Sequence, residues 1–290
     1  MTKNIVPYFM MLPAIIIGSI AMIRNDLPLS IWIQNIMIWV LGCVLGYLFL
    51  SISKKRHSNK NPFDFIPIII SIILLTCPFF TSYSSGVHRW LSIGPIMIYP
   101  ASIFLPLVII YLDKTLANYP ESYTLGLLVI LLLILLFQPD AGQLTAFSCA
   151  ISLLIFKKVD KPVLRYTSLV ILLIFVGLTW LFIDNLAPVS YVENIFSLVK
   201  DMGPHWFVLG TISLILLVLP FFTLATYNWT YFSLGLYFLA EIVVPFFGNF
   251  PMPIMGYGIS PIIGYLIAIT YAINQSDRGT KDILSSAGNE

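Results

Sequence analysis

Ten apolar runs, separated by short polar segments, extend along most of this 290-residue chain. Several of them reach or approach the roughly 20 residues that a helix needs to cross about 30 Å of hydrocarbon. Lipid offers backbone N–H and C=O groups no partner, so spanning segments of this kind must be helices. The runs therefore predict an all-α integral membrane protein, a polytopic bundle of about ten transmembrane helices. The predicted spans are 8–23, 31–52, 65–80, 95–112, 123–137, 144–156, 166–183, 205–226, 231–247 and 257–273.

The composition agrees with a chain whose solvent is the lipid bilayer. Hydrophobic residues make up 59% of it and charged residues 10%, against about 25% charged residues in soluble domains. The net charge of +2 is small and the basic residues are dispersed, which argues against a nucleic acid partner. We expect one transmembrane domain, residues 1–274, followed by a polar cytoplasmic tail, residues 275–290.

The distribution of basic residues orients the bundle. If the N-terminus is cytoplasmic, three cations lie outside, namely Arg24, Arg89 and Lys200, and the other twelve lie inside. This asymmetry is the one that the positive-inside rule predicts. Merging the fifth and sixth spans would move the cations of residues 157–165 to the outer side. Ten spans with both termini cytoplasmic is therefore the favoured topology.

Cysteine and histidine positions give no sign of a metal centre. The three cysteines lie within or at the edge of apolar runs, without paired or metal-ligand spacing. The three histidines fall in separate loops on both sides of the predicted bundle. We interpret the cysteines as core thiols and predict no metal site from these residues.

A polar turn separates the fifth and sixth spans. It contains Gln138 and Asp140 on either side of Pro139. A turn broken by proline would leave backbone groups free to line a polar cavity. Asp140 would equally serve as an ordinary helix cap on the next span. Both interpretations stay open at this point.

Arg89 and Trp90 lie together in an outer loop, residues 86–94. The arginine would clamp a phosphate while the tryptophan anchors at the membrane interface. Alternatively, Arg89 snorkels to the phosphates of surrounding lipids.

Two glutamates occupy unusual positions. Glu241 lies near the middle of the ninth span, where a carboxyl group must be protonated or paired, so we expect it to face the bundle interior. Glu193 lies in the outer loop, within a stretch, residues 191–196, that would suit the membrane surface. Considered alone, Glu193 is typical of a solvated carboxylate.

The segment 250–261 cannot be a regular helix throughout. It carries three prolines and two glycines among apolar residues, and it includes Tyr257 and Ser260. Broken backbone at membrane depth is tolerated where it is buried in protein or lines a cavity. The segment is therefore either a structural break or the wall of a binding site.

Three stretches of the chain carry a resemblance to one family. Residues 86–94 are similar to a family loop G-A-R-R-W-I-x-x-G, and residues 99–102 follow it where the family has Q-P-S-E. Residues 138–143 resemble Q-P-D-L-G-T, and residues 251–260 resemble P-L-P-F-I-S-Y-G-G-S. With these motifs in order on a ten-span scaffold, the chain resembles the SEDS (shape, elongation, division and sporulation) family of RodA, FtsW and SpoVE.

The resemblance implies a role in bacterial peptidoglycan synthesis, cell shape or division at the inner membrane. It implies binding of a lipid-linked disaccharide-pentapeptide, carried on undecaprenyl pyrophosphate, and its polymerisation by glycosyl transfer beside a class B penicillin-binding protein. Glu193 would be the catalytic base, and Arg89 would meet the pyrophosphate. Asp140, Trp90, Gln138, Tyr257 and Ser260 would line the substrate site. A cation, either an arginine or a divalent Mg²⁺ or Mn²⁺ ion, would stabilise the negative charge on the departing pyrophosphate.

The outer loop of this chain, about residues 185–204, is shorter than that of the family, and Ser102 stands where the family has a glutamate. The alternative functions are therefore a catalytically inactive scaffold or regulator of the cell-wall machinery, or a transporter of the lipid-linked precursor.

Overall fold

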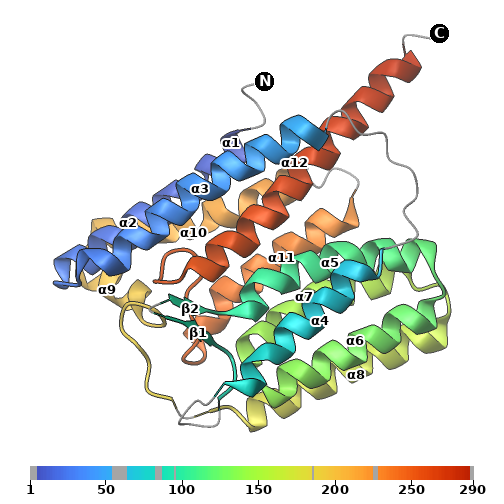
Figure 1. Ribbon diagram of the computed structural model, residues 1–290, viewed down its shortest axis with the longest axis horizontal. Helices are drawn as coiled ribbons and strands as arrows, with labels where there is room; N and C mark the ends of the chain where they lie inside the picture. The colour runs from blue at the N-terminus through green and yellow to red at the C-terminus, as the bar shows by residue number, and fades with distance from the viewer. Residues whose placement is uncertain are drawn as a thin grey trace.

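The computed structural model describes residues 5–53, 64–81, 87–94, 96–184, 186–224 and 228–287, which fold into a helical bundle with one small hairpin (Figure 1). In chain order the elements are α1 (Val6–Phe9), α2 (Leu12–Arg24), α3 (Leu29–Ser53), α4 (Ile66–Thr76), η2 (Cys77–Phe80), β1 (Leu91–Ile93), β2 (Ile96–Ile98), α5 (Pro100–Asn118), α6 (Glu121–Phe137), α7 (Ala141–Lys158), α8 (Pro162–Leu181), α9 (Ile195–Asp201), α10 (Pro204–Leu224), α11 (Trp229–Val243), η3 (Val244–Phe246) and α12 (Ile259–Ala287).

Each of the ten predicted spans contains a helix, α1 and α2 together forming the first, so the all-α membrane fold is confirmed. Among the residues described, six helical segments are long and apolar enough to cross a bilayer, and α4 and α6 are apolar but shorter. Many side chains on α3, α8 and α10 are apolar and exposed, as a surface facing lipid requires.

The two ends of the bundle differ. The hairpin and α9 lie at one end, which we call the outer end (Figure 1). The start of α1 and the C-terminal end of α12 lie at the opposite, inner end (Figure 1). The first and last helices of the described chain therefore have these ends on the same side of the bundle, as the distribution of basic residues predicted.

The predicted span 95–112 begins too early. Strand β1 pairs antiparallel with β2, with Leu91 opposite Ile98, and Gly94 turns the chain with a φ of +61°. Helix α5 starts only at Pro100, a residue whose fixed φ suits the first turn of a helix. An apolar window cannot separate a short apolar strand from the helix that follows it.

The helices that carry the outer site are α5, α7, α11 and α12. Helix α7 packs against α8 and α11, and α5 packs against α4 and α12. A Cβ atom at Gly264 would lie 2.0 Å from the carbonyl oxygen of Ser102, so only glycine lets α12 approach α5 this closely. This contact brings the second turn of α12 against the first turn of α5.

Candidate functional site

Arg89 lies at the outer end, just before β1, and its side chain is only 2% exposed. Its guanidinium forms an ion pair with Asp184, which follows the end of α8. Its Cζ atom stands 5.2 Å from the ring centroid of Trp90. Within the described part of the chain, the Nε atom of Arg89 has no hydrogen-bond acceptor. A buried donor without a partner costs about 1–3 kcal/mol, so this nitrogen is available to an anion.

Asp140 joins three elements at the outer end. Its Oδ1 accepts the backbone N–H of Gln143 at 3.1 Å and so caps α7. Its Oδ2 accepts the hydroxyl of Tyr99. The backbone N–H of Tyr99 donates in turn to Oγ of Ser260, at 2.8 Å. Of the two roles that the sequence left open, Asp140 takes that of the helix cap, and its second oxygen bonds to Tyr99 rather than lining the pocket found here.

Gln143 extends this network to α11. Its Nε2 donates to Oε1 of Glu241 at 2.6 Å, and the hydroxyl of Tyr237 donates to its Oε1 at 2.6 Å. The Tyr237 hydroxyl also lies 3.1 Å from Oε1 of Glu241. Glu241 is buried, so the prediction that it faces the bundle interior is confirmed. Among the residues described, its hydrogen-bond partners are an amide and a phenol, both of which are uncharged.

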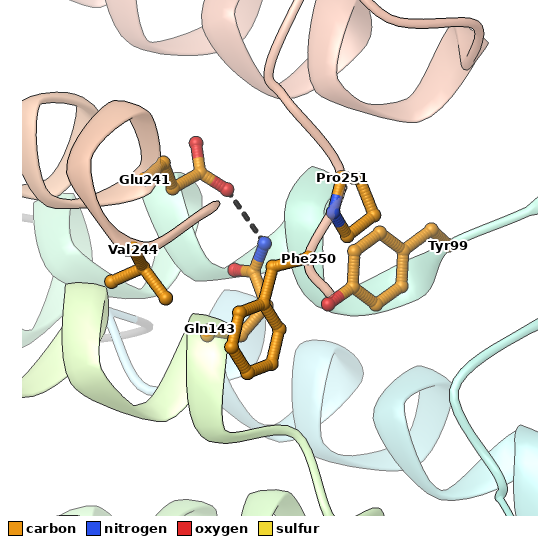
Figure 2. Close-up of a pocket in the computed structure, with 7 residues that line it drawn as sticks. Tyr99, Gln143, Glu241, Val244, Phe250 and Pro251 are labelled. Carbon is orange, nitrogen blue, oxygen red and sulfur yellow. Dashed lines mark hydrogen bonds between the residues drawn. The ribbon is translucent and has the colours of Figure 1, made fainter. Parts of the chain in front are cut away.

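A small pocket lies beside this network. Figure 2 shows Glu241 and Gln143 directed toward one another, with Tyr99 and Pro251 across from them, and Phe250 also lines the pocket. The cavity volume is about 10 Å³, which is the space of about one water molecule. The pocket therefore suits a bound water and is too small for a sugar ring.

The broken segment before α12 is held by the outer loop and by α3. The backbone N–H of Met252 donates to the carbonyl of Val192 at 3.1 Å, and that of Tyr257 donates to the carbonyl of Tyr191 at 2.8 Å. Asn35 of α3 donates from Nδ2 to the carbonyl of Gly256 at 2.9 Å. Neighbouring protein groups thus pair part of this irregular backbone.

Replacing Gly256 with alanine should destabilise the protein by about 1–3 kcal/mol. A Cβ atom there would lie 2.6 Å from the carbonyl oxygen of Val192 and 2.9 Å from that of Met252, and neither is a flexible side chain. Thermal unfolding in detergent measures the effect. Gly177→Ala is the matched control, because a Cβ atom at Gly177 meets nothing within 4 Å. Equal unfolding temperatures for the two variants would contradict the expectation.

Glu193 lies on the same outer loop and is half-buried. Its Oε2 accepts the backbone N–H of Val189 at 2.8 Å. Burial raises the pKa of the Glu193 carboxyl, although its backbone hydrogen bonds and the positive charge of Arg89 act to lower it. The charge of Arg89 acts on Asp140 as well. Arg89 therefore lies within electrostatic range of both carboxyl groups.

The remaining predicted site residues, Trp90, Gln138 and Tyr257, each contact a different part of the bundle. Trp90 packs beside Tyr99, with ring centroids 6.0 Å apart, and so belongs to the cluster around Arg89. Gln138 donates from Nε2 to the carbonyl of Leu75 at 2.6 Å and so braces the turn against α4. The hydroxyl of Tyr257 lies 3.3 Å from Oε1 of Gln34 on α3. The latter two side chains thus bond outside the Asp140 network.

Sequence reasoning missed the partners of the predicted residues. In the sequence, Asp184 is an ordinary polar residue that follows an apolar run. Its ion pair with Arg89 joins two segments that are far apart in the chain, so no local sign of it exists in the sequence. Tyr99 and Tyr237 looked like two aromatic residues among many. Gln143 stands where the family motif has threonine, and that departure was the one local signal of a different role.

The described residues do not present a cation site of their own. No group of three or more His, Cys, Asp or Glu side chains in these parts of the chain is placed to hold a metal ion. The side chains present do not fit a divalent cation held by the protein alone.

Comparisons with known proteins agree with this description. The family model FtsW/RodA/SpoVE, described as cell cycle protein, matches residues 1–203. Among curated protein sequences, none matches the chain. RodA of Thermus thermophilus, a rod shape determining protein, has a similar fold in two crystal structures, each with a TM-score of 0.71 and 17% sequence identity. The match to the unaltered protein covers 93% of this chain and 95% of RodA.

A chain from a peptidoglycan synthase complex that coordinates polymerization and crosslinking is also similar. Its TM-score is 0.69 and its identity 16%, over 93% of this chain and 96% of that chain. The fold and the buried outer cluster define a multi-pass membrane protein with a polar site at one end of its helical bundle. This chain belongs to the FtsW/RodA/SpoVE family, that is, to the SEDS proteins.

Proposed function

We propose that this protein acts in cell-wall synthesis in the bacterial inner membrane by binding an undecaprenyl-pyrophosphate-linked glycan at its outer end. The single observation that carries the proposal is Arg89, a buried guanidinium whose Nε lacks an acceptor among the described atoms. Arginine is the side chain best suited to bind a pyrophosphate through several hydrogen bonds. Family membership supports the role in the cell wall.

The ligand must compete with a carboxylate for this arginine. Asp184 holds the guanidinium in the structure described here. A pyrophosphate carries more negative charge than a carboxylate, so it would bind Arg89 and release Asp184. Asp140 contributes indirectly, because it fixes the first turn of α7 and the hydroxyl of Tyr99 around the site.

We infer further that the bound precursor is polymerised, with Glu193 as the base. Glu193 would take the proton from a sugar hydroxyl whose oxygen attacks an anomeric carbon. The bond from that carbon to the pyrophosphate oxygen breaks, and undecaprenyl pyrophosphate leaves with the electron pair. Arg89 would stabilise the negative charge that develops on this leaving group. The raised pKa of Glu193 makes it a stronger base than an ordinary glutamate once it is ionised.

The partner proposed for this activity is a class B penicillin-binding protein, which would crosslink the strands. The likeness to a chain of a peptidoglycan synthase complex supports such an assembly. The partner would have to engage the bundle through the lipid-facing surface or at the outer end.

A catalytically inactive scaffold is the second candidate, and a specific observation favours it. The pocket beside Glu241 has room for about one water, and Arg89 is closed against Asp184. A protein that only binds its partner would keep the fold and tolerate such a closed site.

One experiment distinguishes the two functions. The purified protein is incubated with lipid-linked disaccharide-pentapeptide and Mg²⁺ or Mn²⁺, with and without a class B penicillin-binding protein, and glycan strands are separated by size. Strands formed by the protein but not by its Arg89→Gln variant support polymerisation. Failure to form strands in any mixture, with the partner bound, would favour the scaffold over the polymerase, and a flipping assay in sealed vesicles would then test transport.

A further inference from the structure

Asn35 is a buried polar side chain on α3, a helix whose buried residues are only Asn35, Gly46 and Leu50. It is 1% exposed, and a buried amide without partners would be costly at this position. Its Nδ2 donates to the carbonyl of Gly256 at 2.9 Å, and its Oδ1 accepts the backbone N–H of Gly258 at 3.3 Å. One side chain of α3 therefore pairs two backbone groups of the irregular segment before α12.

That segment, residues 252–258, has a backbone that does not hold itself. Ile254 is buried with a φ of +66°, a conformation that a β-branched residue rarely adopts. Pro253 has no N–H to donate. Strained backbone of this kind persists only where its surroundings enforce it. Here the surroundings are Asn35 on α3 and Gly18 on α2, where a Cβ atom would lie 2.0 Å from the carbonyl oxygen of Met255.

The segment in turn holds the outer loop that carries Glu193. The backbone N–H of Met252 donates to the carbonyl of Val192, and that of Tyr257 donates to the carbonyl of Tyr191. The rings of Tyr191 and Tyr257 also pack edge to face, with centroids 5.9 Å apart. Glu193 is the next residue of the loop, so its backbone is placed by these contacts.

Glu193 belongs to a closed turn, residues 189–193. The backbone N–H groups of Val192 and Glu193 both donate to the carbonyl of Val189 at 3.0 Å, and Oε2 of Glu193 accepts the N–H of Val189. These bonds fix the direction of the carboxyl group within the turn. They do not fix the position of the turn relative to Arg89, which depends on what the turn rests against.

We propose that Asn35 is a positioning residue for Glu193. It clamps the backbone at Gly256 and Gly258, and so holds the segment on which the turn 189–193 rests. The inference rests on the function proposed above, in which Glu193 is the base. A displacement of about 1 Å at a reacting group can lower a rate about a hundredfold. Asn35 therefore influences the rate without touching the substrate.

Asn35→Leu tests the clamp, because leucine keeps the size of the side chain and removes both hydrogen bonds. The carbonyl of Gly256 and the N–H of Gly258 would be left without their partner, which favours opening of the segment. Hydrogen–deuterium exchange of the protein in nanodiscs is the measurement. The amide of Met252 and those of residues 189–193 should exchange about tenfold faster than in the wild type.

Tyr8→Phe is the matched control. It also removes a buried hydrogen bond, that between the Tyr8 hydroxyl and Oγ1 of Thr270 at 2.7 Å. This bond lies beside Gly46, eleven residues or about 16 Å along α3 from Asn35, so exchange at residues 189–193 should not change. Asn35→Ala leaves space for a water that can pair the two backbone groups. It should show a smaller change in the same direction, and it tests the clamp where the leucine variant does not fold.

Activity provides the second measurement. With equal amounts of folded protein, Asn35→Leu should lower the kcat of glycan polymerisation about 10- to 100-fold, and Tyr8→Phe should not. The acid limb of the pH profile should move to lower pH in Asn35→Leu. Burial is the main cause of the raised pKa of Glu193, and a loosened turn is more solvated; the loss of the weaker effect of Arg89 would act in the opposite direction.

The outcomes separate this proposal from the proposed function. Exchange in Asn35→Leu equal to that of the wild type would overturn the clamp. Faster exchange with an unchanged kcat and acid limb would show that Asn35 does not position the base. A wild type that forms no glycan strands would defeat the role of Glu193 instead, and exchange alone would then decide whether Asn35 holds the turn 189–193.

Discussion

Replacing Arg89 with methionine should destabilise the fold by about 3–5 kcal/mol, the usual cost of removing one partner from a buried ion pair. The substitution leaves the carboxylate of Asp184 poorly exposed and without its cation. Thermal unfolding in detergent, followed by loss of monomer on size exclusion, measures the effect. Asp201→Asn is the control, because Asp201 is an exposed carboxylate at the end of α9.

The double variant Arg89→Met with Asp184→Leu separates structure from ligand binding. Removing both charges should restore most of the lost stability, since neither partner of the Arg89–Asp184 ion pair is left behind without the other. Binding of the pyrophosphate-linked lipid should stay lost, because the guanidinium is still absent. An Arg89→Met variant as stable as the wild type would show that the ion pair contributes nothing to the fold. A double variant that binds the lipid normally would remove Arg89 from the proposed site.

Replacing Glu193 with glutamine should lower the rate of glycan polymerisation by a factor of about 10² to 10⁴, the usual contribution of a general base. Glutamine keeps the shape of the side chain and its bond to the Val189 N–H, but it cannot accept a proton. Product formed per minute from lipid-linked disaccharide-pentapeptide is the measurement, with Asp201→Asn as the control outer carboxylate. Equal rates for Glu193→Gln and the wild type would exclude Glu193 as the base.

The pH dependence of polymerisation should show an acid limb set by Glu193. Its pKa is raised because the carboxyl is half-buried, and a base acts only when ionised. Activity should therefore fall as the pH drops through this raised pKa, which lies above that of an ordinary glutamate. The residual activity of Glu193→Gln should lack this limb. An acid limb that is the same in both proteins would assign it to another group.

The sequence predicted what depends on local information. Apolar run length located the ten spans because each span must satisfy its own backbone hydrogen bonds in lipid. The same reasoning placed Glu241 inside, since a lipid-facing carboxylate at that depth is costly. The hairpin before α5 was missed, because three-residue apolar strands look like the start of a span until Gly94 and Pro100 are considered.

The site could be predicted only in part, for a physical reason. Asp140 and Arg89 stood out as single residues, but their environment is made by residues distant in the chain. Tyr99 and Asp140 are 41 residues apart, and Tyr237 and Gln143 are 94 apart. No periodicity within one helix encodes such a pairing. Family motifs located the segments, and packing decided which side chains meet.

The hydrogen bonds of α7 have a consequence for how the protein is made. Of the helices described, α7 is not among those that length and composition alone mark as able to span a bilayer. Its Gln143 bonds with Glu241, a residue that leaves the ribosome 98 positions later. Until α11 enters the membrane, the outer turn of α7 lacks these partners and is costly to keep in lipid. Assembly of the bundle is therefore complete only after α11 has inserted, because α11 supplies the hydrogen-bond partners of α7, a helix that is synthesised long before it.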